Sequence, residues 1–534
     1  MSRAIGFVLS ASGIAAGAVA LSLAGSPAES ATAKRSAKTI SVFKSSEVSP
    51  AESCAALTGL TVEAGSVESA ERFANDATIT GDASPGAKAQ TDICRVRLRL
   101  QPVPGSDIRV EVWLPEQWNK KLMGFGGGGF DGSLNADSWK ILNPATARGY
   151  AAVVTDVGHV PAPTPGTWIH KQPEKVIDFG HRGTHLAAVV AKQVISTFYG
   201  TPAKRAYFQG CSNGGRDGLS LASRYPNDYD AIVAGAPAAR YVEVVTQLAW
   251  YSQAARGAPG LGSKLDLLHN AILKQCDKLD GVKDGILENP RACRFDPGVL
   301  QCKSSDAADC LNGQEVEAAR KIYTGPKLKD GQQVMAPPSL GSEGNPGNWG
   351  AWITGPIPGM AAEEFYRWMV FDDPKWSLAG FDLDRDYGVA RSRIVPVIDS
   401  DNPDLRPFIR RGGKLIIYQG WDDPAITAES TLDYFEKVRK TVGPAADRQI
   451  RIFMVPGMAH CGGGPGATSF DMQKPLEDWV ERGVVPKRIV ATKPDVAADQ
   501  APFSRPLCPW PMTARFTGKG SIRDADNFIC KARN

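Results

Sequence analysis

Short apolar runs that end in glycine or another turn residue recur along most of this chain, and they predict buried parallel strands. Two earlier runs, 96–102 and 108–115, instead alternate apolar with polar residues, as an antiparallel hairpin does. The buried runs occupy residues 121–127, 150–158, 205–210, 229–235, 414–420 and 450–457. Stretches with the apolar period of a helix lie between them, at 183–200 and from 214 onward. This order predicts an α/β fold, with a doubly wound sheet that begins with antiparallel strands.

The alternation of predicted strands and helices is interrupted between residues 240 and 407. This stretch is rich in proline and glycine, contains four cysteines, and has tryptophans at positions 349, 352, 368 and 376. We interpret it as a large inserted lid domain over the carboxyl ends of the strands. The sheet domain is then made of two parts, residues 50–239 and 408–534.

The first 33 residues have the pattern of a signal peptide. One arginine precedes an uncharged run of Ala, Gly, Leu and Val, and Ala31-Thr-Ala33 resembles a cleavage site. An uncleaved membrane anchor stays open as an alternative, because residues 4–25 are long enough to span a bilayer. Residues 34–49 are polar and predict a mobile segment. We therefore expect a secreted or periplasmic protein that keeps no membrane contact once the signal is cleaved.

Composition narrows the class of protein. The 534 residues include 43% hydrophobic and 22% charged residues, as in an ordinary globular protein, and the net charge is only +4. Since no basic stripe is present, we expect no nucleic-acid partner. Ten cysteines, an even number in an exported chain, predict up to five disulfides. Four pairs are close in sequence: Cys54 with Cys94, Cys276 with Cys293, Cys302 with Cys310, and Cys508 with Cys530.

The stretch 210–214, Gly-Cys-Ser-Asn-Gly, matches the G-x-S-x-G pattern of a nucleophile elbow, and its serine is Ser212. In α/β-hydrolases the acid and then the base follow the serine, each after a strand. The run 414–420 is followed by Asp422 and Asp423, and the run 450–457 by His460. The sequence thus predicts a Ser–Asp–His triad, although spacing alone does not choose between the two aspartates.

His460 is the only histidine after the two aspartates, so it has no competitor as the base. The remaining histidines, at 159, 170, 181, 185 and 269, show no sequence partner that indicates catalysis. Cys211 and Cys461 flank Ser212 and His460, so a Ser–His hydrogen bond would bring the two cysteines within bridging range. Two unrelated buried thiols are the alternative.

A tetrahedral intermediate needs N–H donors for its oxyanion. The amide of Asn213, directly after the serine, is one candidate. The glycine run at 126–129 offers Gly128 or Gly129 as the second, because a glycine lets the backbone approach a substrate. A flexible turn is the other interpretation, and a phosphate loop is disfavoured because no G-K-[ST] follows.

Carboxylates are concentrated at Asp277, Asp280 and Asp284, and the carbonyls of Val282 and Ile286 are available between glycine-containing bends. Hard oxygen ligands in so short a stretch suit a structural Ca²⁺ ion, although the spacing is not that of an EF-hand. A solvated acidic turn is the alternative.

Together, the Gly-Cys-Ser-x-Gly-Gly stretch at 210–215, the G-x-x-D at 420–423 and the dipeptide His460-Cys461 resemble the tannase and feruloyl esterase family of secreted serine hydrolases. The resemblance implies the Cys211–Cys461 disulfide and selects Asp423 as the acid. It also implies a lid calcium loop of the form D-x-x-D-G-x-x-D-G.

Members of that family cleave esters of aromatic acids, so the resemblance implies a secreted serine carboxylesterase for feruloyl, galloyl or related esters of plant cell walls or tannins. A mono(2-hydroxyethyl) terephthalate hydrolase of the same family is the alternative. Arg367 and Phe371 resemble the lid positions that hold the carboxylate and ring in that branch, while a lid salt bridge is an equal interpretation of Arg367. A secreted peptidase and a non-catalytic binding protein remain as other classes.

Overall fold

The computed structural model describes residues 50–81, 84–132, 134, 136–160, 166–344, 347–493 and 502–532. The predicted signal peptide (1–33) and the predicted mobile segment (34–49) lie outside the described residues. The described residues all belong to one compact unit.

A ten-stranded sheet forms the centre of the molecule, in the order β1-β2-β5-β6-β8-β7-β9-β10-β11-β12. The pairs from β1 to β8 are antiparallel, and those from β8 to β12 are parallel. All eight predicted strands are present, so this part of the prediction is confirmed. The strands are β1 (Thr61–Val62), β2 (Gly65–Phe73), β5 (Ile93–Leu100), β6 (Ile108–Pro115), β7 (Lys121–Phe125), β8 (Ala151–Thr155), β9 (Arg205–Cys211), β10 (Ala231–Gly235), β11 (Lys414–Gly420) and β12 (Ile450–Val455).

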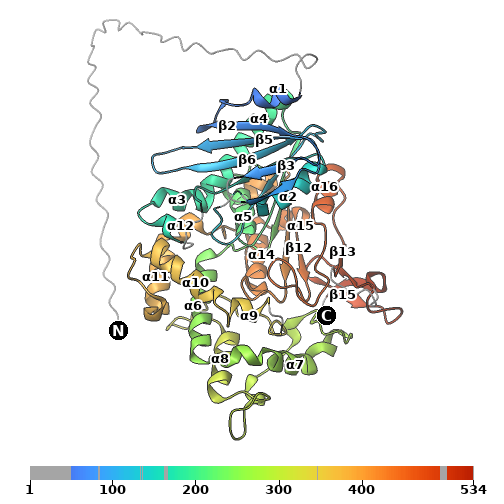
Figure 1. Cartoon of the computed structure of the whole chain (residues 1–534). Helices are drawn as coiled ribbons and strands as arrows, with labels where there is room; N and C mark the ends of the chain where they lie inside the picture. The colour runs from blue at the N-terminus through green and yellow to red at the C-terminus, as the bar shows by residue number, and fades with distance from the viewer. Residues whose placement is uncertain are drawn as a thin grey trace, which may run out of the picture. The chain divides into compact units, whose positions relative to one another are not determined.

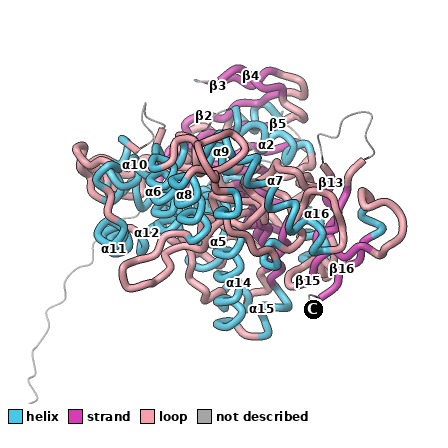
Figure 2. The backbone as a smooth tube through the Cα atoms, turned by 90° about the horizontal axis from the view of Figure 1, so that it is seen from below, coloured by secondary structure: helices cyan, strands magenta, loops and turns pink. Residues whose placement is uncertain are grey.

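Helices cover both faces of this sheet, as expected for a doubly wound fold (Figures 1 and 2). On α4, for example, Leu186, Val190 and Val194 recur every fourth residue, so they form one buried stripe against the strands. One face carries α4 (Gly183–Tyr199), α5 (Asn213–Arg224), α13 (Arg406–Arg410) and α14 (Ala428–Val442). The other face carries α2 (Ala136–Ala147) and α16 (Gln473–Arg482).

The segment between β10 and β11 is mostly helical, and its described residues add no strand to the large sheet. Figure 1 shows these green to yellow helices gathered below the sheet, where α6 and α10 pack against each other. That this segment forms a lid domain over the carboxyl ends of the strands stays a prediction. The helices are α6 (Tyr241–Gly257), α7 (Leu265–Cys276), α8 (Gly313–Thr324), α9 (Trp349–Trp352), α10 (Ile357–Glu364), α11 (Leu383–Arg393) and α12 (Val395–Ile398).

Several smaller elements were not predicted, because they bury few side chains or are only two to six residues long. β2 is an example, since only Val67 and Ala70 of its nine residues are buried. The other such strands are β3 (Thr78–Gly81), β4 (Ser84–Lys88), β13 (Ile489–Thr492), β14 (Ser504–Leu507), β15 (Met512–Phe516) and β16 (Phe528–Ala532). The short helices α1 (Pro50–Ala55), α3 (Pro173–Ile177) and α15 (Pro444–Gln449) complete the described α-helices and strands.

All ten cysteines are paired, and the predicted pairing is confirmed at every bridge. The disulfides are Cys54–Cys94, Cys211–Cys461, Cys276–Cys293, Cys302–Cys310 and Cys508–Cys530. Among the described residues, no helix is both long enough and apolar enough to cross a membrane.

Candidate active site

Ser212 lies on a sharp turn between β9 and α5, with φ of 62°. A non-glycine residue with positive φ costs about 1–3 kcal/mol, so the turn must be held by its surroundings. Its N–H donates to the carbonyl of Gly235 at 3.0 Å. A Cβ on Gly214 would lie 2.8 Å from the carbonyl carbon of Gly126, and one on Gly210 would lie 2.5 Å from that of Gly214. The glycines around the serine are therefore required by close backbone packing.

The structure brings the three predicted triad residues together from three separate parts of the chain. The Ser212 hydroxyl lies 2.9 Å from His460 Nε2, and His460 Nδ1 donates to Asp423 Oδ2 at 2.8 Å. Asp423 is fully buried, and its other oxygen accepts the N–H groups of Ala425 and Ile426 at 2.9 Å each. These bonds fix the carboxylate and, through it, the imidazole orientation that leaves Nε2 free to accept the serine proton.

The neighbouring aspartate, Asp422, has a different environment. Burial, followed by the nearby charge of Glu343, raises the pKa of Asp422 well above its usual range. No hydrogen bond joins its carboxyl group to His460 in the described structure, whereas Asp423 makes that contact. Burial lowers the pKa of His460, but the charge of Asp423 and the hydrogen bond to it outweigh burial, so this pKa is raised overall.

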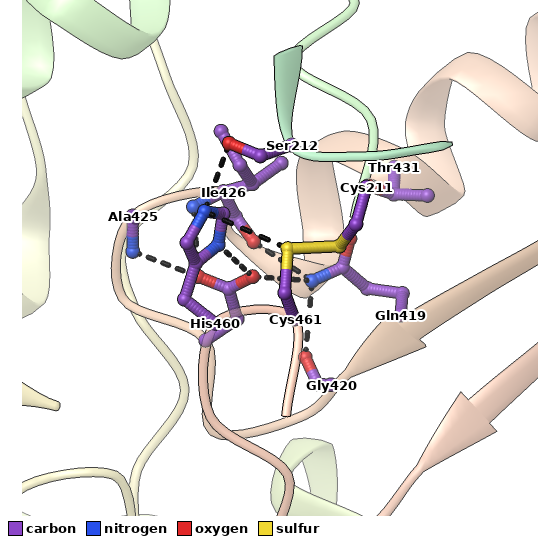
Figure 3. Close-up of a disulfide and its surroundings, with 10 residues drawn as sticks. Cys211, Ser212, Gln419, Gly420, Ala425, Ile426, Thr431, His460 and Cys461 are labelled. Atoms are coloured by element: carbon purple, nitrogen blue, oxygen red, sulfur yellow. Dashed lines mark hydrogen bonds and ion pairs between the residues drawn. A yellow bond between two sulfur atoms is a disulfide. The ribbon is translucent and has the colours of Figure 1, made fainter. Parts of the chain in front are cut away.

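Figure 3 shows the Cys211–Cys461 disulfide beside the imidazole of His460, with Ser212 close to the ring. The two Cα atoms are 6.0 Å apart, although 250 positions separate them in sequence. The Cys461 sulfur lies 3.8 Å from His460 Nε2. The bridge therefore ties the turn that carries the nucleophile to the loop that carries the base.

The predicted oxyanion donors lie on the same side of the site. Asn213 is the first residue of α5, so its amide has no acceptor within the helix. Within the described structure, the amides of Gly128 and Gly129 donate to no other protein group, and both residues line the pocket at Ser212. No heavy atom lies within 4 Å of a Cβ built on either glycine. These amides are available to a ligand oxygen.

A pocket of about 500 Å³ opens onto Ser212. His460 is the only titratable nitrogen among its lining side chains, and Trp352 of the lid lies edge-on to its ring with centroids 4.9 Å apart. The lining residues are Gly128, Gly129, Phe130, Cys211, Ser212, Asn213, Ala238, Tyr241, Val244, Val245, Leu248, Trp352, Ile357, Met360, Ala361, Ala425, Ile426, His460 and Cys461. The space suits a flat apolar group of the size of a substituted aromatic ring.

Arg367 and Phe371 are not among the residues that line this pocket, so their expected contact with substrate stays a prediction. The Arg367 guanidinium pairs with Glu363 and with Glu364, and it donates to the Trp376 carbonyl at 3.0 Å. Phe371 stacks on Trp376 within the lid. The lid salt bridge is the role that the contacts of Arg367 support.

The acidic loop packs against the C-terminal strands. Asp284 pairs with Arg505 of β14, and Asp277 Oδ1 accepts the N–H of Gly285 at 3.0 Å. Asp280 accepts the N–H of Val282 at 2.9 Å. Within the described residues, no three His, Cys, Asp or Glu side chains converge as a formed metal site. The donor chemistry of three carboxylates and two backbone carbonyls, those of Val282 and Ile286, nevertheless fits a hard cation.

Sequence reasoning missed the residues that support the site. Phe130 and Tyr241 line the pocket, and Asp131 accepts from the side chain of Asn213 at 2.9 Å. Gln419 donates to Asp423 at 3.3 Å and is held by Thr431 at 2.8 Å. Only the adjacency of Phe130 and Asp131 to the glycine run gave any signal of their position.

A hydrolase-type sheet that carries Ser212, His460 and Asp423 in hydrogen-bonding contact beside an apolar pocket defines an α/β-hydrolase with the layout of a serine esterase. The model of the family described as tannase and feruloyl esterase matches residues 94–531, and the chain belongs to this family. The protein is accordingly a carboxylic ester hydrolase.

Three relatives illustrate the likeness. The mono(2-hydroxyethyl) terephthalate hydrolase of Piscinibacter sakaiensis is 33% identical, over 84% of this chain and 87% of that one. A probable feruloyl esterase B-2 of Aspergillus flavus is 32% identical, over 78% and 83%. The crystal structure of feruloyl esterase B from Aspergillus oryzae superposes with a TM-score of 0.82 at 27% identity, covering 90% of this chain and all of that one.

Proposed function

We propose that this protein hydrolyses uncharged esters of aromatic acids, such as feruloyl or galloyl esters, through an acyl-enzyme on Ser212. The observation that carries the proposal is the apolar pocket at Ser212, lined by Phe130, Tyr241 and Trp352. Aromatic rings bind such surfaces by area burial and gain about 0.5–1.5 kcal/mol more from favourable ring geometry.

In the first half of the reaction, His460 Nε2 takes the proton of the Ser212 hydroxyl as the oxygen attacks the ester carbonyl carbon. The oxyanion that forms accepts hydrogen bonds from the backbone N–H groups of Asn213 and of Gly128 or Gly129. His460 then gives its proton to the departing alkoxide, which leaves as the alcohol. In the second half, His460 takes a proton from a water molecule, which attacks the acyl-enzyme. The acid is released and the Ser212 hydroxyl is restored.

Hydrolysis of mono(2-hydroxyethyl) terephthalate is the second candidate, and the 33% identical relative of that name supports it. That substrate carries a carboxylate at the far end of its ring. Among the described residues, no lysine or arginine lines the pocket, and Arg367 is already paired with two glutamates. Because burying an unpaired carboxylate is costly, we favour the uncharged esters.

Two further properties belong to this proposal. Secretion is supported by the five disulfides, which persist in oxidising compartments, and by the leader-like pattern of residues 1–33. A structural Ca²⁺ ion would be held by Asp277, Asp280 and Asp284 with the carbonyls of Val282 and Ile286. It would supply a positive charge to a loop in which three carboxylates face a single paired arginine, Arg505.

The test compares kcat/KM for methyl ferulate, methyl gallate, mono(2-hydroxyethyl) terephthalate and an aliphatic methyl ester of similar length. We expect the uncharged aromatic esters to exceed the aliphatic ester by about tenfold or more, equivalent to about 1.4 kcal/mol of transition-state binding. The Ser212→Ala variant provides the control and should lose at least about 10³-fold. Preference for the aliphatic ester would refute the aromatic pocket, and preference for the terephthalate would select the second candidate.

A further inference from the structure

The loop that carries the oxyanion donors has four consecutive glycines, Gly126 to Gly129. Glycine loses more conformational freedom on folding than any other residue, so such a loop holds its shape only where other groups restrain it. Side-chain packing does not restrain Gly128 and Gly129, because the space where their Cβ atoms would lie is open. The restraint must come from the residues on either side.

Two hydrogen bonds tie this loop to the start of α5. The N–H of Gly214 donates to the carbonyl of Gly127 at 2.9 Å, and the side-chain amide of Asn213 donates to Asp131 Oδ2 at 2.9 Å. Both bonds lead to the segment that carries Ser212, so they keep the loop near the nucleophile. Neither acts on Phe130, which directly follows the two donor glycines.

The third tie comes from His159, which follows β8. Its Nε2 lies 2.7 Å from the carbonyl oxygen of Phe130. A carbonyl oxygen only accepts, so Nε2 carries the proton and donates it. The ring stacks on Trp168 with centroids 3.5 Å apart and planes 9° apart. The imidazole also packs closely against the backbone of Gly132, because a Cβ built on that glycine would lie only 2.4 Å from Nε2.

His159 is 3% exposed, and burial lowers the pKa of its imidazole to about 4. The ring therefore stays neutral at the pH at which a histidine base such as His460 works. It is also outside the pocket lining, so it does not contact the substrate. Among the sequence features it carried no catalytic signal, because its partner is a backbone carbonyl of a distant segment.

We infer that His159 is a positioning residue for the oxyanion loop: by holding the Phe130 carbonyl, it sets where the amides of Gly128 and Gly129 point. The inference rests on the proposed acyl-enzyme mechanism at Ser212. It has a specific consequence, because a misplaced donor weakens binding of the oxyanion and leaves binding of the neutral ester largely intact. Loss of the tie should therefore lower kcat and spare KM.

The test is a matched pair, His159→Gln and His159→Asn. Both replace the imidazole by an amide, but only the glutamine amide extends as far as Nε2 does. We expect His159→Gln to keep kcat within about threefold and His159→Asn to lose about 10- to 100-fold, since removal of a whole oxyanion donor costs about 10²–10³-fold. His159→Phe keeps the stacking on Trp168, removes the donor, and should lose as much as His159→Asn.

Each variant is assayed with p-nitrophenyl acetate and with methyl ferulate, and inhibition constants are measured for phenylboronic acid and for cinnamic acid. The boronate forms a tetrahedral adduct with a serine and needs the oxyanion donors, whereas cinnamic acid needs only the pocket. We expect His159→Asn and His159→Phe to weaken boronate binding about tenfold or more and to leave cinnamic acid within about twofold.

His181→Asn is the matched control, because the His181 imidazole is hydrogen-bonded to the Tyr225 hydroxyl at 2.7 Å and not to the oxyanion loop. It should lower the melting temperature without changing kcat or boronate affinity. The inference would be overturned if His159→Gln, His159→Asn and His159→Phe all had the same kcat and the same boronate affinity as one another. It would also be overturned if a variant lost boronate binding and cinnamic acid binding to the same extent. If the wild type cleaves p-nitrophenyl acetate but not methyl ferulate, the aromatic-substrate proposal fails while the His159 comparison still decides the positioning role.

Discussion

At the scale of single residues, two adjacent carboxyl groups have opposite properties. Asp423 accepts hydrogen bonds from two backbone amides and from the Nδ1 of His460. Asp422 is buried near Glu343, and its raised pKa favours the neutral acid. The two aspartates are neighbours in the sequence, but only Asp423 is hydrogen-bonded to His460.

The substitution Asp423→Asn should therefore lower kcat by about 10³–10⁴-fold, because the amide no longer stabilises the imidazolium or fixes its tautomer. The wild-type acid limb of the pH–kcat/KM profile should lie above the ordinary histidine pKa, since the pKa of His460 is raised. In the variant, burial remains while the charge of Asp423 is lost, so this limb should move to lower pH. Residual activity is measured on p-nitrophenyl acetate from pH 4 to 9.

Asp422→Asn is the control for this change. An amide mimics the neutral acid that burial favours at this position, so kcat should stay within about threefold and the pH profile should not move. Equal losses in the two variants would contradict the assignment of Asp423 as the partner of His460.

At the scale of elements, the site depends on two loops that follow different strands. Ser212 follows β9, and His460 follows β12, with β10 and β11 between them in the sheet. The Cys211–Cys461 bridge joins the two loops directly and closes 250 positions of chain. In the chain-entropy model, a loop of this length contributes about 5 kcal/mol, compared with about 2.5 kcal/mol for a loop of eight residues.

We expect the double variant Cys211→Ala/Cys461→Ala to lose both stability and activity. Its kcat should fall about tenfold or more, because nothing then restrains the Ser212–His460 distance against loop motion. The matched control removes the Cys302–Cys310 bridge in the lid, which spans only eight positions. That variant should show a smaller fall in melting temperature and an unchanged kcat, as measured by thermal unfolding and by steady-state kinetics. An active Cys211→Ala/Cys461→Ala variant with normal kcat would limit the bridge to a purely stabilising role.

At the scale of the whole molecule, the acidic loop connects the lid segment to the C-terminal strands. Asp284 pairs with Arg505, and Glu288 accepts the N–H of Ala514 at 2.8 Å. Val282 packs in a small core with Cys508, Ala514 and Phe528. The loop thus links segments more than 200 residues apart, so whatever stabilises it stabilises the assembly of these parts.

If calcium binds this loop, chelation should lower the melting temperature by several degrees and leave kcat at low temperature within about twofold. A ligand present at 100 times its Kd adds about 2.7 kcal/mol to the free energy of unfolding. Asp277→Asn should lower the melting temperature and remove its dependence on chelator. Elemental analysis of purified protein, together with melting curves with and without EDTA, checks this. If the purified protein contains no metal and EDTA does not change its melting curve, the loop is a solvated acidic turn and not a calcium site.

The central strands and the order of Ser212, the aspartates and His460 along the chain were predictable, because both depend on local sequence patterns. A buried parallel strand needs a continuous apolar run, and the elbow at Ser212 needs glycines at 210 and 214 to avoid backbone collisions. The strand β2 was not predictable, since only two of its nine residues are buried, and the C-terminal strands were not, since each has only four or five residues. The pairing of Arg367 with Glu363 and Glu364 was likewise not evident from the sequence, because a pattern of residue types does not show which charged groups meet in the fold.

The sequence by itself determined the α/β class, the candidate nucleophile and base, and the four cysteine pairs that are close along the chain, because each depends on residue type, chain order or neighbouring positions. Only the tertiary structure decided which side chains line the pocket and which ones restrain the donors, since Trp352, Tyr241 and His159 come from segments that meet only after folding. The physical reason is that a local pattern records which face of an element is buried. It does not record what that face is buried against.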